Sequence, residues 1–285
     1  MRWLLGLLGP VFGRPGRRAE QLGVGGDIGP AAIDALRRAL ATDGPLTRAQ
    51  VKERLAPLGV DPSGQAAVHV VHRAALEGAL CIVIGPGGEE RYVPLDDRVP
   101  PAAGPPLEPA PAAAELARRY LAAFAPAVPA DFAAWSGLPA ALARRAWADL
   151  AGELTDVEEH DRTSWVLTAR EGAVEDAAGG GPLPVRLVGA FDNVVLAYAD
   201  RRLTVDPGFA GRVNAGGGMI RPVVVADGAV AGTWAYRRRG RSRTVEVDPF
   251  RPFTPAERDD VAAEVADVGC YLGTDPALVW VAGGE

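Results

Sequence analysis

Residues 46–95, LTRAQVKERLAPLGVDPSGQAAVHVVHRAALEGALCIVIGPGGEERYVPL, determine the fold that this sequence predicts. Thr47 is a suitable N-cap for a helix in which Val51 and Leu55 face inward. Two apolar runs on either side of Gly-Pro-Gly-Gly predict a β-hairpin at the end of the segment. Between them, a second helix is expected to begin at Pro62-Ser63, with an inward stripe made of Val68, Val71, Ala75 and Leu76.

A further helix is expected just before this segment, because Ile33, Leu36 and Leu40 recur at helical spacing. Three helices followed by a β-hairpin are typical of the winged-helix variant of the helix-turn-helix. The third helix of such a unit is shaped to enter the major groove of DNA.

The same pattern repeats in residues 112–167, after the proline-rich linker PPAAGPPLEPAP at 100–111. A hairpin is expected from Leu154 to Leu167, turning at EEHDRTS. Two copies in tandem favour winged helices, and a pair of helical interaction modules that never touch DNA is the alternative. The residues expected to face inward on the three helices are Leu116, Tyr120, Phe124, Phe132, Trp135, Leu142, Trp147 and Leu150.

The last third of the chain changes character after the glycine-rich break AAGGGPLP at 177–184. Residues 219–250 predict a three-stranded meander with turns at Asp227-Gly228 and Arg239-Gly240. Period-two spacing places Val230, Trp234 and Tyr236 on one face of the sheet. Val245 and Val247 of the next strand are expected on the same face. A closing helix is expected to cover this sheet, with Thr254 and Glu257 as a capping box and an inward stripe of Val261, Val265, Val268 and Leu272.

The sequence therefore predicts an α+β protein in which tandem winged-helix units precede a β-rich C-terminal domain with a closing helix. The expected domains are a remnant of a first winged-helix unit at 1–27, winged-helix units at 28–100 and 111–170, and the β-rich domain at 183–285.

Composition limits the class of protein and its compartment. The chain of 285 residues is 48% hydrophobic and carries a formal charge of −6, so its net charge does not indicate a nucleic-acid binder. Cys81 and Cys270 lie too far apart in sequence for a metal or redox motif, which fits a reducing cytoplasm. The opening MRWLLGLLGP is too short to span a bilayer and lacks a cleavage site after it. We expect a cytoplasmic, nucleoid-associated protein that does not enter the membrane.

Candidate DNA contacts come from three places in the sequence. The densest basic run, YRRRGRSR, lies at a turn of the meander and indicates a phosphate clamp; a solvated turn that guards an edge strand is the alternative. Arg201 and Arg202 are expected to extend that surface, and Gln65, His69 and Arg73 follow the outer side of the helix shaped for the major groove. The basic run contributes Arg237, Arg238, Arg239, Arg241 and Arg243.

Metal and cofactor sites are not expected. His69 and His72 stand three residues apart, but no carboxylate or cysteine completes a ligand set, and EEHD at 158–161 falls at a hairpin tip. The loop GRVNAGGGM at 211–219 lacks the Lys-Ser/Thr of a phosphate-binding loop and opens no helix. Asp192 and Asn193 are expected to make a turn-stabilising hydrogen bond.

Four segments together resemble the bacterial tandem winged-helix DNA glycosylases that excise bulky alkylated purines and unhook interstrand crosslinks. They are DPSGQAAVHVVHRAALEG (61–78), FDNVVLAYADR (191–201), VVVADGAVAGTW (223–234) and VEVDPFRPFTPAERDDVAAEV (245–265). The likeness extends from about Met1 to Leu272. The resemblance implies three winged-helix units followed by a β-rich C-terminal domain. It also implies a monomer that binds duplex DNA, including damaged or crosslinked DNA.

The family's catalytic Gln-x-Gln or Gln-x-Asp motif has no counterpart in this sequence. The glutamines are Gln21, Gln50 and Gln65, and none has Gln or Asp two residues later. The resemblance therefore implies that the chain lacks most of the first unit, and no catalytic residue is assigned. Trp3, Leu4, Leu7 and Leu8 are then expected on a helix whose apolar side chains are exposed or repacked.

Three functions stay open at this point. The first is a DNA-binding protein of the glycosylase family without the catalytic segment. The second is a tandem winged-helix transcription regulator or another non-enzymatic DNA binder, and the third is a protein–protein scaffold.

Overall fold

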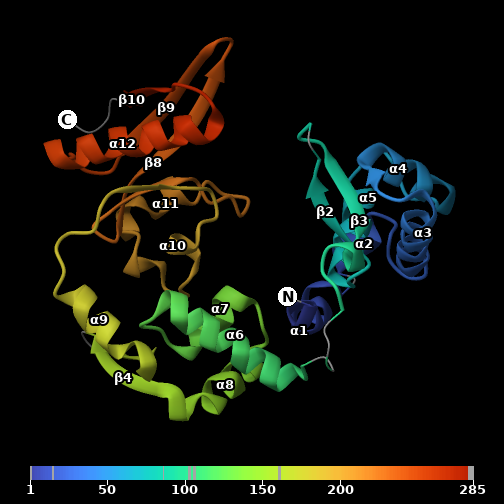
Figure 1. Ribbon diagram of the computed structural model, residues 1–285, viewed down its shortest axis with the longest axis horizontal. Helices are drawn as coiled ribbons and strands as arrows, with labels where there is room; N and C mark the ends of the chain where they lie inside the picture. Colours follow the sequence, from blue (N-terminus) through green and yellow to red (C-terminus); the bar gives the residue numbers. More distant parts are fainter. Residues whose placement is uncertain are drawn as a thin grey trace. The chain divides into compact units, whose positions relative to one another are not determined.

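The computed structural model describes residues 2–14, 16–85, 87–101, 104, 107–159 and 162–281. They form two compact units, residues 1–116 (unit 1) and 117–285 (unit 2), each of which is described by itself. Figure 1 shows the chain and labels most of its helices and some of its strands. The mixed α+β class is confirmed, whereas the finer division into four domains stays a prediction.

Unit 1 contains a winged helix. A three-stranded antiparallel sheet in the order β1-β3-β2 pairs the two wing strands with a short strand that the sequence analysis missed. This strand was missed because its two residues pair with a segment more than forty positions away (Leu46 with Tyr92). The elements are α3 (Ile28–Asp43), β1 (Leu46–Thr47), α4 (Arg48–Leu55), α5 (Ala66–Leu76), β2 (Leu80–Ile84) and β3 (Glu90–Pro94).

The core of this winged helix confirms the expected inward faces of its first two helices. Ile33, Leu36 and Leu40 on α3 are buried, as are Val51 and Leu55 on α4. A capping box closes the N-terminus of α4, as predicted at Thr47: the Thr47 hydroxyl accepts from the Gln50 backbone N–H, and the Gln50 side chain accepts from the Thr47 backbone N–H.

The inward stripe expected for the third helix is confirmed at Val71 and Ala75, but its expected start at Pro62-Ser63 and the inward position of Val68 are wrong. The Asp61 carboxylate accepts hydrogen bonds from the backbone N–H and hydroxyl of Ser63, at 2.8 and 2.7 Å, which holds residues 61–64 in a turn. The helix α5 therefore begins at Ala66, and Val68 is 45% exposed. The residues that face the core are Ala66, Ala67, Val70, Val71 and Ala74.

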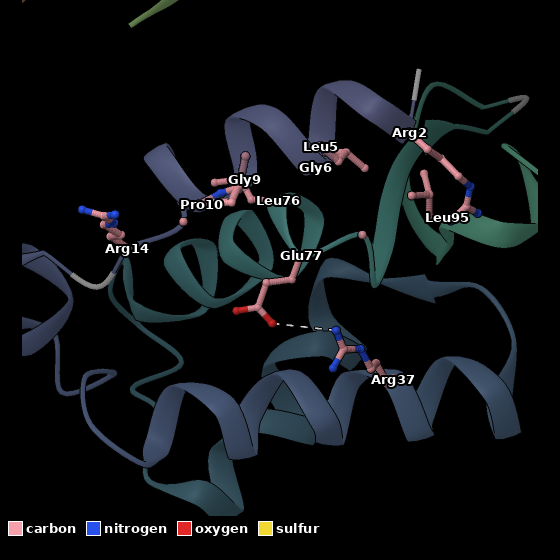
Figure 2. A pocket seen from close by; sticks show the side chains of 12 residues that line it. Arg2, Leu5, Gly6, Gly9, Pro10, Arg14, Arg37, Leu76, Glu77 and Leu95 are labelled. Atoms are coloured by element: carbon pink, nitrogen blue, oxygen red, sulfur yellow. Dashed lines mark ion pairs between the residues drawn. The ribbon is translucent and has the colours of Figure 1, made fainter. Parts of the chain in front are cut away.

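The apolar opening of the chain packs within unit 1. Helix α1 (Arg2–Phe12) lies against the C-terminal end of α5, and its Leu7 is 4% exposed. The two helices approach most closely at Gly9, where a Cβ would lie 2.7 Å from the carbonyl oxygen of Leu76. Figure 2 shows the cavity of about 700 Å³ beside this contact, with an ion pair between Arg37 and Glu77. The segment is therefore a packed helix, followed by the short α2 (Arg17–Gln21).

We predict opposite effects for alanine at two glycines of α1. Gly9→Ala should lower the free energy of unfolding of unit 1 by roughly 1–3 kcal/mol, because the new methyl group meets backbone that cannot move aside freely. Gly6→Ala is the matched control, since a Cβ there meets nothing within 4 Å. It should raise stability by about 0.5–1 kcal/mol through the lost flexibility of the unfolded chain. Urea unfolding measures both, and an equal response of the two variants would contradict the close contact.

Unit 2 begins with the second winged helix. Its hairpin confirms the expected span from Leu154 to Leu167, whereas the hairpin tip at His160 and Asp161 lies outside the described residues. A bridge between Ala127 and Trp165 takes the place of the short first strand of unit 1. The elements are α6 (Pro109–Phe124), whose second half belongs to unit 2, α7 (Pro129–Ser136), α8 (Ala140–Asp149), β4 (Leu154–Glu159) and β5 (Arg162–Leu167).

Aromatic side chains fill much of the core of this winged helix. The Phe132 ring is fully buried, and its centroid lies 5.6 Å from that of Tyr120 and 6.3 Å from that of Trp147. All eight side chains that the sequence analysis placed inward are buried or half-buried, so the inward faces of these helices are confirmed.

The β-rich end of unit 2 holds a five-stranded sheet in the order β10-β9-β8-β7-β6. The meander is confirmed, with φ of 49° and 76° at Asp227 and Gly228 as a type I′ turn requires. The edge strand β10 was not expected; it runs parallel to β9. The elements are α9 (Glu171–Ala178), β6 (Arg186–Val188), α10 (Asn193–Leu196), α11 (Ala210–Val213), β7 (Val223–Ala226), β8 (Ala229–Arg239), β9 (Ser242–Pro249), α12 (Pro255–Leu272) and β10 (Ala277–Trp280).

A β-bulge changes which side chains share a face of this sheet. Val230 pairs with Val225 and Gly232 pairs with Val224, so Ala231 is an extra residue in β8. Ala231 therefore joins the cluster under α12, and Val230 joins the cluster on the other side. The expectation that Val230 shares a face with Trp234 is wrong for this reason.

Helix α12 covers one face of the sheet, as Figure 1 shows. Val261 and Val265 are buried and Val268 is half-buried, as expected, but Leu272 is 42% exposed. The expectation for Leu272 is wrong because the chain turns away at Gly273, where φ is 60°. The buried residue near the end of α12 is Gly269, where a Cβ would lie 2.7 Å from the ring of Pro276.

The capping box of α12 predicts a pH dependence of stability. Hydrogen bonds from the Arg251 guanidinium, and further ones from Thr254, lower the pKa of Glu257 from 4.5 to about 2. A depressed carboxyl pKa contributes stability above pH 4.5, and that contribution is lost as the pH falls toward 2. Glu257→Gln should lower the unfolding free energy at pH 7 by at most about 1 kcal/mol and flatten this part of the profile. Thermal unfolding between pH 2 and 7 measures it; the control Asp260→Asn, on the exposed side of α12, should keep the wild-type profile.

Candidate nucleic-acid interface

The basic run lies at the turn between β8 and β9, beyond the part of both strands that packs into the core. Gly240 at the first turn position has a φ of 57°, as a type II′ turn requires. We call the five side chains here the basic turn: Arg237, Arg238, Arg239, Arg241 and Arg243. The register places Arg238 directly opposite Arg243.

The charges of the basic turn are only partly balanced. Arg237 pairs with Glu246 across the strands, with 3.0 Å between Nε and Oε2. Arg243 donates hydrogen bonds to the carbonyl oxygens of Gly240 and Ser242, at 2.8 and 2.9 Å. In the described ranges, Arg238, Arg239 and Arg241 form no ion pair, and all three are exposed. Like charges directly opposite one another destabilise a strand pair, so this turn is suited to binding an anion.

The second group of expected contacts lies at the other end of β8. The backbone N–H of Val230, at the start of this strand, donates to the carbonyl oxygen of Thr204, at 2.8 Å. Arg239 is nine residues further along the strand, which is about 30 Å. The structure therefore does not bring Arg201 and Arg202 to the basic turn. Two parallel contacts with the Asp200 carboxylate hold the Arg202 guanidinium and raise its pKa.

The third group of expected contacts, on α5, faces the N-terminal segment of unit 1. The Gln65 side chain accepts a hydrogen bond from Arg18, at 2.9 Å. Arg73 donates to Glu77, at 2.9 Å, and its guanidinium lies over Gly29, 2.6 Å from where a Cβ would stand. His69 lines a cavity of about 250 Å³ next to these residues. The roles of Gln65, His69 and Arg73 toward DNA stay predictions.

Two hydrogen bonds that the sequence does not predict join the second winged helix to the β-rich end of unit 2. The buried Asp131 carboxylate accepts hydrogen bonds from the backbone N–H groups of Val128 and Ala199, each at 3.0 Å. The Tyr120 hydroxyl donates to the carbonyl oxygen of Ala197, at 2.8 Å. These contacts fix the segment 191–201 on the second winged helix. Within this segment Asp192 caps α10 by accepting from Val194, which confirms the expected turn-stabilising bond.

Among the described residues, none of the helices has the length and the apolar character that a membrane span requires. The described part of the chain also contains no group of three or more His, Cys, Asp or Glu side chains placed to hold a metal ion.

Comparison with known proteins gives consistent matches. The family model for AlkZ-like DNA glycosylases matches residues 1–271. An interstrand DNA cross-link repair glycosylase of Streptomyces sahachiroi is 35% identical over 131 residues, which are 45% of this chain and 35% of that relative. The solved structure of the S. sahachiroi DNA glycosylase AlkZ superposes with a TM-score of 0.74 and 26% identity, covering 97% of this chain and 76% of that one.

Proposed function

This chain belongs to the AlkZ-like DNA glycosylase family, and from that membership we propose that it binds duplex DNA, including damaged and crosslinked duplexes. We also propose that the protein is a monomer and that it is located at the nucleoid. The relative and the solved structure with which it shares sequence and fold are named as DNA glycosylases, and one is named for crosslink repair.

The basic turn is the observation that carries the proposal. Arg238 and Arg243 face one another across the strands, and in the described residues neither meets a carboxylate. A hairpin with this arrangement is stabilised when a phosphate lies between the two side chains. Phosphate contacts of this kind fix position on DNA and carry no sequence information by themselves.

We further propose that the chain as given binds DNA without releasing a base. Cleavage of a glycosidic bond requires a polar group that positions water and stabilises the positive charge on the sugar. The side chain of each glutamine in this sequence has a neighbour within unit 1. Gln50 closes the capping box of α4, Gln65 accepts from Arg18, and Gln21 lies 3.5 Å from the same arginine.

The proposal is tested by one paired assay on the full chain. A plain duplex and the same duplex with one interstrand crosslink are titrated at 50 and 200 mM salt, and base release is scored in the same samples. One phosphate contact from each of Arg238, Arg239, Arg241 and Arg243 predicts an affinity loss of about 100-fold between the two salt concentrations. Affinity that does not respond to salt would contradict DNA binding through the basic turn. Release of a base would contradict the non-catalytic part of the proposal alone.

A further inference from the structure

Phe191 has a backbone conformation that its side chain does not favour. It is one of two non-glycine residues with positive φ in the described chain, at 61°, and its ring is 50% exposed. Bulky side chains rarely adopt the left-handed region, and residues held there concentrate at functional sites. The chain is fixed directly after Phe191, because Asp192 caps α10 and the Asn193 side chain accepts a hydrogen bond from Trp135. The fold therefore holds an aromatic ring out in solvent.

A small cavity lies next to this turn. Trp135, Asn193, Tyr198 and Arg201 line it, and its volume is about 300 Å³. This volume lies at the lower end of the range for small-molecule sites, which suits one planar ring and excludes a duplex. The cavity belongs entirely to unit 2, between α7 and the segment that contains α10.

Hydrogen bonds within the protein hold the two aromatic rings that line the cavity. The Trp135 indole N–H donates to the Asn193 side-chain oxygen, at 3.1 Å, and the Tyr198 hydroxyl donates to the carbonyl of Phe124, at 3.0 Å. Both rings are thereby held in place. The Asn193 amide N–H₂ keeps its two donors, and in the described part of the chain Arg201 makes no side-chain hydrogen bond or ion pair. Aromatic faces with amide and guanidinium donors are the groups that proteins use to bind an unpaired nucleotide.

We propose that Phe191 and this cavity form a binding site for one unpaired nucleotide of DNA. Phe191 stacks on the base step that the nucleotide leaves, the rings of Trp135 and Tyr198 face its base, and Arg201 binds its phosphate. The inference rests on the proposed function, since it takes DNA as the ligand. In addition to the phosphate contacts of the basic turn, the protein would then have a second DNA contact that recognises an unpaired base. This second contact lies at the opposite end of β8.

Phe191→Gly is the variant that separates this role from a structural one. Glycine accepts a positive φ without a steric penalty, so the melting temperature should stay the same or rise. Met219→Ala is the matched control, because Met219 is also 50% exposed in the same domain. Arg201→Gln tests the phosphate contact.

The probe is a 20-base-pair duplex with one unpaired 2-aminopurine, compared with the same duplex fully paired. We expect wild-type protein and Met219→Ala to bind the bulged duplex more tightly and to change the 2-aminopurine fluorescence. Phe191→Gly should lose about five- to 150-fold in affinity for the bulged duplex, the range found for base–aromatic stacking, and little for the paired one. Arg201→Gln should lose part of the same preference.

The outcomes distinguish this inference from the proposed function. If the wild-type chain binds paired duplex in a salt-dependent way but Phe191→Gly keeps the full preference for the bulge, the inference is overturned and the proposed function stands. If the wild-type chain binds neither duplex, both are overturned. Loss of the preference in Phe191→Gly with an unchanged melting temperature supports the site.

Discussion

Replacing Arg238, Arg239 and Arg241 together by glutamine is expected to lower the affinity for plain duplex DNA roughly 100-fold at 50 mM salt. The three guanidinium groups are exposed and form no ion pair in the described chain, so their charge is available to phosphates. Each lost phosphate contact reduces the slope of log affinity against log salt by about 0.9, so the slope should fall by about 3. Fluorescence anisotropy at four or more salt concentrations measures both quantities.

The control lies on the same strand. Arg237→Gln removes a side chain that Glu246 already neutralises, at 3.0 Å, so it should reduce affinity by much less than Arg238→Gln. The two residues are neighbours on β8 and point to opposite faces of the hairpin. Equal losses in the two single variants would show that net charge alone governs binding, and would contradict phosphate contacts made by the arginines that form no ion pair.

Phe132→Ala is expected to destabilise unit 2 by about 3–5 kcal/mol, the second large effect. The ring is 0% exposed and lies between those of Tyr120, Trp135 and Trp147, with centroid distances of 5.6, 6.5 and 6.3 Å. Removing the Phe132 ring leaves a cavity, because the large neighbouring rings cannot move far enough to fill it. Because whole domains are stable by only about 5–15 kcal/mol, much of the folded population should be lost in mild denaturant. Tryptophan fluorescence during urea unfolding reports on the change.

Phe191→Gly is a suitable comparison for that measurement, because it removes the same side chain from a position that is 50% exposed. Its unfolding free energy should stay within about 0.5 kcal/mol of wild type or rise. If Phe132→Ala lowered the unfolding free energy by as little as Phe191→Gly does, the result would contradict the aromatic core of the second winged helix.

Local patterns in the sequence are sufficient for much of this fold. Helical spacing identifies the inward faces around Leu36 and Phe132, and Thr47 and Thr254 begin their helices where capping chemistry predicts. The turn at Asp227 and the basic turn are likewise properties of a few adjacent residues. Such features depend on side-chain chemistry within one or two turns of chain, so they can be read before any tertiary contact is known.

Some errors arise from local irregularities and others from distant contacts. The turn between Asp61 and Ser63 delays the start of α5, and the extra residue at Ala231 exchanges the faces of β8. Strand β10 forms only because β9 is already present to pair with it. Periodicity assumes an unbroken helix or strand, so one inserted residue is enough to change which side chains are buried.

The sequence alone determined the family resemblance, the winged-helix and meander elements and the concentration of arginines in one turn, because each depends on residues close together in the chain. Only the tertiary structure decided which arginines of the basic turn form no ion pair with the described residues, and that Arg201 lies far from that turn. It also brought Trp135 to Asn193, 58 positions away, and fixed Phe191 in solvent beside their cavity. These features depend on the pairing of strands and on hydrogen bonds between distant segments, and they form only when the chain has folded.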